Sequence, residues 1–86
     1  MKSKQVTMIT DGFHVILAKQ FSTVAAAFES EIRVVWEGKN IISDGKSILG
    51  LMALELKRGM SVTLTAEGPD EDRAIERLSA IVEAGV

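Results

Sequence analysis

One histidine and one serine are the residues of this 86-residue chain best suited to chemistry, and each precedes a predicted helix. His14, the only histidine, follows Gly12-Phe13 and comes just before an apolar helical pattern. A neutral imidazole nitrogen is a nucleophile at neutral pH. The free N–H groups and the dipole of a first helical turn can hold a phosphoryl dianion, and a glycine lets the backbone fold close to it. The pattern indicates a phosphoryl acceptor; the alternative is an ordinary cap or loop histidine.

Ser47 stands at the start of a second apolar run. Its hydroxyl is expected to accept a backbone N–H bond of the first turn, a cap worth about 1 kcal/mol. A phosphate at a helix N-terminus is also favoured electrostatically. Ser47 is therefore a candidate regulatory phosphorylation site as well as a cap.

The composition excludes several classes of function. The chain has no cysteine, which removes disulfides, thiolate chemistry and cysteine metal sites. A single histidine leaves no catalytic triad and no metal cluster, so we expect no enzyme activity, no metal and no cofactor. The formal charge is -2 without a basic run, so nucleic acid is not an expected partner. No apolar run is long enough for membrane insertion and the N-terminus lacks a secretory pattern, which favours a cytoplasmic protein.

The elements that must position these two residues are predicted from hydrophobic periodicity. With 47% hydrophobic residues, the chain suits one domain over residues 1–86. Strands are expected at residues 4–10, 32–36, from 41 on and at 60–66; helices are expected at 15–28, 47–57 and from 69 on. The order β-α-β-β-α-β-α predicts an α+β open-faced β-sandwich, a four-stranded sheet with three helices on one face.

Two stretches resemble the HPr family, the phosphocarrier of the bacterial sugar phosphotransferase system. "GFHVILA" is similar to the family pattern G-[IFL]-H-A-R-P-A, and "KSILGLMAL" to K-S-I-M-G-[VL]-M-S-L. The matching residues are Gly12, Phe13, His14, Ala18, Lys46, Ser47, Ile48, Gly50, Leu51, Met52 and Leu54. The chain departs from the pattern at Ile16 and Leu17, which replace an arginine and a proline, and its link before Ser47 is longer than usual.

The resemblance implies that His14 takes a phosphoryl group from Enzyme I and passes it to a phosphoacceptor protein of a sugar transporter. It also implies that a serine kinase acts on Ser47 and that the product assists a transcriptional regulator. Because Ile16 cannot give the donors of an arginine, transfer is expected to be less efficient. The alternative is a regulatory adaptor of the HPr fold that lacks histidine phosphotransfer and acts by docking.

A docking surface around the histidine is the last prediction. In the family, the histidine loop and the second helix form one such surface, and an exposed apolar patch usually marks a partner site. The alternative is that these side chains are core, as expected for Leu51 and Leu54 together with Phe21, Val24 and Phe28. The residues predicted for the docking surface are Phe13, Ile16, Leu17, Lys19, Ile48, Leu49 and Met52.

Overall fold

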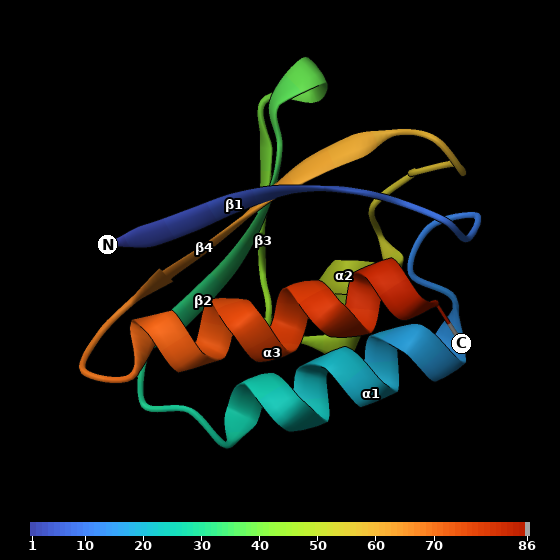
Figure 1. Ribbon diagram of the computed structural model, residues 1–86. Helices are drawn as coiled ribbons and strands as arrows, with labels where there is room; N and C mark the ends of the chain where they lie inside the picture. The colour runs from blue at the N-terminus through green and yellow to red at the C-terminus, as the bar shows by residue number, and fades with distance from the viewer. Residues whose placement is uncertain (86) are drawn as a thin grey trace.

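The computed structural model describes residues 1–85 and confirms the predicted order of elements (Figure 1). Its elements are β1 (Lys2–Thr7), α1 (Val15–Ala26), β2 (Glu31–Trp36), the short 3-10 helix η1 (Glu37–Lys39), β3 (Ile41–Asp44), α2 (Ile48–Met52), β4 (Ser61–Glu67) and α3 (Glu71–Ala84). The predicted α+β fold class is thus confirmed.

The four strands form an antiparallel sheet in the order β1-β4-β2-β3. Along β4, Val62, Leu64 and Ala66 are buried while the residues between them are more exposed, because successive side chains of a strand point to opposite faces. The helices α1 and α3 run side by side across the face that these residues cover (Figure 1). The other face is open, which leaves the layer of helices as the place where the histidine loop is presented.

The core lies between this layer and the sheet, and both long helices contribute a stripe to it. Val24 and Phe28 are partly buried at its edge, while Phe21, Leu51 and Leu54 lie inside, as predicted. The buried residues of the two stripes are Leu17, Ala18, Phe21, Ser22 and Ala25 of α1, and Ala74, Ile75, Leu78, Ser79 and Val82 of α3.

The second helix is much shorter than predicted. Sequence periodicity placed its end at about Lys57, but α2 ends at Met52. Beyond it, Leu54 and Leu56 are buried and Glu55 is exposed, which is the alternation of an extended segment rather than of a helix. The apolar run therefore has two parts, a short helix and an extended segment, and each buries only some of its side chains.

Candidate functional site

His14 is the N-cap residue of α1. Its backbone is extended, with φ -68° and ψ 171°, and its Nδ1 atom accepts a hydrogen bond from the N–H of Leu17 at 3.3 Å. Its carbonyl oxygen accepts the N–H of Ala18 at 2.8 Å, which starts the helix. The residue is half-buried, so the ring lies at the surface rather than in the core.

This geometry defines which nitrogen of His14 is available. Because Nδ1 accepts a hydrogen bond, the neutral ring carries its proton on Nε2. The N–H groups of Val15 and Ile16 also belong to the first turn, where no helical partner exists for them. The first turn of α1 contains no acidic residue. Nδ1 therefore carries an unprotonated electron pair beside backbone donors, an arrangement that suits the formation of a bond to phosphorus.

The loop that presents His14 is held against the extended segment after α2. Gly12 has φ +78°, and a Cβ atom there would lie 2.9 Å from the carbonyl oxygen of Leu56. The carboxylate of Asp11 accepts the N–H of Arg58 at 3.2 Å, and the hydroxyl of Thr10 donates to the carbonyl oxygen of Gly12 at 2.9 Å. The loop is thus fixed by close backbone packing at Gly12 and by the hydrogen bonds of the Asp11 and Thr10 side chains.

Two residues predicted for the docking surface belong to the core instead. Phe13 is only 3% exposed, and its ring meets that of Phe21 edge-on with centroids 5.4 Å apart. Leu17 is fully buried. The prediction was wrong for both because nearness to His14 in sequence says nothing about the direction of a side chain. For Leu17 a signal was present, since it lies four residues before Phe21 in the apolar stripe of α1.

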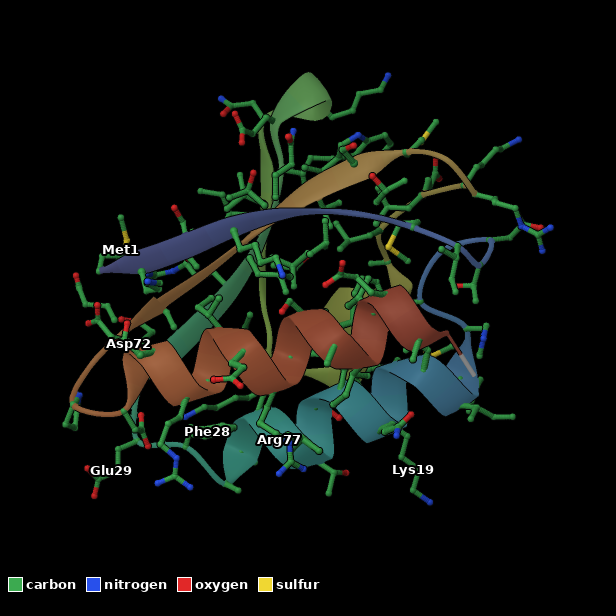
Figure 2. All side chains as sticks on the ribbon, in the orientation of Figure 1. Met1, Lys19, Phe28, Glu29, Asp72 and Arg77 are labelled. Carbon is green, nitrogen blue, oxygen red and sulfur yellow. The ribbon has the colours of Figure 1, made fainter. Side chains whose placement is uncertain are left out.

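The remaining predicted residues do form an exposed surface. Ile16 is 62% exposed and Leu49 80%, and Ile48 and Met52 are exposed as well. Lys19 extends outward from α1 into solvent (Figure 2). The prediction omitted Val15, which is 59% exposed directly beside His14. A hollow of about 610 Å³ follows the outer side of α1, lined by Val15, Ile16, Lys19, Gln20, Thr23 and Val24.

Ser47 caps α2, as predicted. Its Oγ atom accepts the N–H of Gly50 at 3.0 Å, and the residue is half-buried. The neighbouring Lys46 anchors this loop, because its ammonium donates to the carbonyl oxygen of Phe28 at 2.9 Å and its N–H to the carboxylate of Asp44 at 2.9 Å. Ser47 is therefore placed by bonds on both sides.

Residues 1–85 include many acidic side chains and three α-helices. Within them, no three histidine, cysteine or acidic residues are grouped so that they could hold a metal ion. None of the helices formed by these residues has both the length and the apolar character needed to cross a membrane.

Comparisons with known proteins agree with this site. Residues 2–84 match the family model described as the PTS HPr component phosphorylation site. The phosphocarrier protein HPr of Haemophilus influenzae is 41% identical over 83 residues, which cover 95% of each chain. The crystal structure of an HPr from Thermoanaerobacter tengcongensis has a TM-score of 0.88 at 35% identity, covering 98% of this chain and 93% of the other. The solution structure of Crh, the Bacillus subtilis catabolite repression HPr, has a TM-score of 0.72 at 35% identity, covering 99% of this chain and all of the other. Because the family model spans residues 2–84 and the Haemophilus influenzae relative is 41% identical over nearly its whole length, the chain belongs to the HPr family of phosphocarrier proteins.

Proposed function

We propose that this protein carries a phosphoryl group on Nδ1 of His14, taking it from Enzyme I and giving it to a phosphoacceptor protein of a sugar transporter. The single observation that supports this best is the bond from the Leu17 N–H to Nδ1. It leaves the nucleophilic electron pair on the nitrogen that lies against the first turn of α1. A carrier between these two partners acts in the cytoplasm, which is the proposed location.

The transfer needs no group beyond the imidazole and the helix. Nδ1 forms the bond to phosphorus while the bond to the donor breaks, and Nε2 keeps its proton. The N–H groups of Val15, Ile16 and Leu17 then donate to the phosphoryl oxygens, assisted by the positive end of the helix dipole. Ile16 adds no charged donor, so the transition state is stabilised by backbone groups alone and transfer is slow.

Labelling with Enzyme I and phosphoenolpyruvate tests the proposal. An acid-labile phosphoryl adduct is expected on the wild type. The matched variant is His14→Asn, because asparagine is a good N-cap residue and preserves the helix start; it should fold like the wild type and take no label. A wild type that stays unlabelled under conditions that label an ordinary HPr contradicts the proposal.

The exposed apolar side chains beside His14 are the proposed docking surface for these partners. The surface consists of the exposed Val15 and Ile16 of α1 and the exposed Ile48, Leu49 and Met52 of α2, and Lys19 gives it a positive edge. The helices α1 and α2 are in contact. A patch of this kind favours association with another protein.

Leu49→Glu tests the docking surface. Since Leu49 is highly exposed, the thermal midpoint should stay close to that of the wild type, while labelling of His14 becomes slower. Ile42→Glu, at an exposed apolar position of β3, is the matched control and should be labelled at the normal rate. Equal labelling of both variants and the wild type would count against the surface.

A second function is favoured by the apolar first turn of α1 and by the similarity to the catabolite repression HPr. In this alternative the protein is a regulatory adaptor, phosphorylated on Ser47 by a serine kinase and read by a transcriptional regulator. A phosphate on Ser47 would lie at the N-terminus of α2. Mass spectrometry of the wild type and Ser47→Ala after kinase treatment tests this alternative, and a phosphate is expected on the wild type alone. Labelling of His14 by Enzyme I distinguishes the two functions, since only the carrier takes that label.

A further inference from the structure

The hairpin of β2 and β3 projects beyond the rest of the sheet, with η1 at its tip (Figure 1). The strand β4 pairs with β2 only as far as Val35, so the last cross-strand pair, Trp36 with Ile41, belongs to the hairpin alone. Ile41 is 42% exposed and Ile42 61%. Since neighbouring residues of a strand point to opposite faces, the projecting hairpin is apolar on both of its faces.

The strand β3 also has a free edge. Among residues 1–85 it pairs only with β2. The N–H of Gly45 donates to the carbonyl oxygen of Ile32 at 2.8 Å, and hydrogen-bonded pairs alternate along an antiparallel ladder. The N–H and C=O of Ile42 therefore point away from β2, toward the edge.

This edge lacks several of the features by which proteins usually prevent strand pairing, although β3 is only four residues long and ends at the charged Asp44. No lysine or proline occurs between Asn40 and Asp44, and the register of β3 with β2 is unbroken. The opposite edge of the sheet, β1, carries Lys2 and Lys4, both in ion pairs with α3. The β1 edge thus carries two lysines, whereas the charge on the β3 edge is confined to its last residue.

We propose that a second copy of this chain pairs with β3 through its own β3, antiparallel, with Ile42 on the two-fold axis. Two registers pair the outward groups of Ile42 with a residue of the second β3, one with Ile42 opposite Ile42 and one with Ser43 opposite Ser43. In the first, Ile41 lies opposite Ser43, and the two Ile42 side chains meet beside Val35 on the open face. In the second, Asp44 lies opposite Ile42, which pairs a charge with an apolar side chain. The first register is favoured because it pairs apolar side chains with each other and leaves no carboxylate opposite an isoleucine.

The charges around the edge agree with this register. It places the η1 turn of the second copy, which contains Lys39, at the Asp44 end of β3, next to a hollow of about 480 Å³. The carboxylates of this hollow outnumber its cations; the charged residues that line it are Glu29, Glu31, Asp44, Arg33 and Lys46. Arg33 is paired with Glu31 and the Lys46 ammonium is bonded to Phe28, so negative charge remains available to the incoming lysine.

Sedimentation velocity tests the proposal on the full chain. From about 10 μM to about 1 mM, the range in which small interfaces associate, the wild type should shift from monomer toward dimer. Ile42→Lys, which puts two like charges on the axis, should remain a monomer, and Leu49→Lys should dimerise like the wild type. A wild type that is monomeric throughout, or an Ile42→Lys protein that still dimerises, overturns the proposal.

A cross-link gives a second measurement. The chain has no cysteine, so Ile42→Cys introduces the only thiol. Directly opposed residues of an antiparallel pair lie about 5.5 Å apart at Cα, within reach of a disulfide. Oxidation should give a disulfide dimer of Ile42→Cys much faster than of Leu49→Cys; equal rates contradict the arrangement. Labelling of His14, measured on Ile42→Lys, should be unchanged, so this proposal and the carrier proposal can fail separately.

Discussion

At His14, the nitrogen that caps α1 is also the proposed nucleophile. In the free protein Nδ1 satisfies the N–H of Leu17, and in the phosphorylated form the same electron pair is used for the bond to phosphorus. The phosphoryl oxygens then take over as acceptors for the first turn. In the proposed transfer, capping and phosphoryl binding use the same helix terminus in turn, and the helix start is expected to stay satisfied in both states.

The residue that limits this chemistry is Ile16. Ile16→Arg is expected to speed phosphoryl transfer to His14, because a guanidinium in the first turn adds a charged donor for the phosphoryl oxygens. A hydrogen bond to a charged group is worth about 1.5 to 3 kcal/mol, which corresponds to about 10- to 150-fold in rate. The initial rate of labelling by Enzyme I measures the effect. Ile16→Gln adds a neutral donor and should increase the labelling rate much less. Equal rates for the two variants would contradict a role for the charge.

The role of each residue around His14 was predictable to different degrees. The glycine before it, the cap position and the exposed Ile16, Leu49 and Met52 follow from sequence, because they depend on local helix geometry and on apolar residues in excess of what the core accepts. Phe13 does not. Its burial depends on a contact with Phe21 across a loop, and sequence spacing carries no information on that contact.

At the scale of elements, the histidine loop and the extended segment after α2 act as one unit. Gly12 and Gly59 both have positive φ, +78° and +92°, but a Cβ at Gly12 meets the Leu56 backbone whereas one at Gly59 meets no atom of residues 1–85 within 4 Å. Alanine in this conformation costs about 1 to 2 kcal/mol, which is the expected loss for Gly59→Ala. Gly12→Ala should cost more, because a backbone oxygen cannot move aside. Chemical denaturation measures both.

The same pair of variants connects the loop to function. Gly12→Ala should also slow labelling of His14. Gly12 lies only two residues before His14, and the loop must move to separate the new Cβ atom from the backbone of Leu56. Gly59→Ala should lose stability without losing the labelling rate. If both variants lose the labelling rate equally at a temperature where both are folded, the contact between loop and segment has no special part in presenting the histidine.

The segment after α2 also shows why one element was mispredicted. Residues 48–56 contain leucine, isoleucine or methionine at most positions, so helical and alternating periods both fit. The choice is made by tertiary contacts, since Leu54 and Leu56 reach the core only from an extended chain that packs on the histidine loop. The other elements have one clear period, and their order and types were correctly predicted.

At the scale of the whole molecule, Asp70 joins the start of β2 to the start of α3. Its carboxylate accepts the hydroxyl and N–H of Ser30 and the N–H of Glu29. Glu29 and Phe28 lie at the same end of the molecule as Asp72, near the start of α3 (Figure 2). These residues are far apart in sequence, so no local pattern predicts the link.

The link makes stability depend on pH. Hydrogen bonds from the Ser30 hydroxyl, and then from the Glu29 N–H, hold the pKa of Asp70 below its ordinary value of 3.8. The N–H of Gly68 and the N-terminal ammonium lower the pKa of Glu71 in the same way. A lowered pKa in the folded state means that the charged carboxylate stabilises the fold fully above its unfolded pKa. This contribution is lost as the pH falls through the lower, folded pKa.

Asp70→Asn is therefore expected to lower the thermal midpoint at neutral pH and to reduce the difference from the wild type as the pH falls below about 4. Asparagine keeps one acceptor oxygen but not the charge that three donors share in the wild type. Thermal unfolding followed by circular dichroism across the acid range measures the two curves. Asp72→Asn, two residues further along the chain and in an ion pair with Lys2 at 3.7 Å, is the matched control and should retain the acid transition of the wild type. A constant difference between Asp70→Asn and the wild type at all pH values would show that the carboxylate charge does not hold α3 to β2.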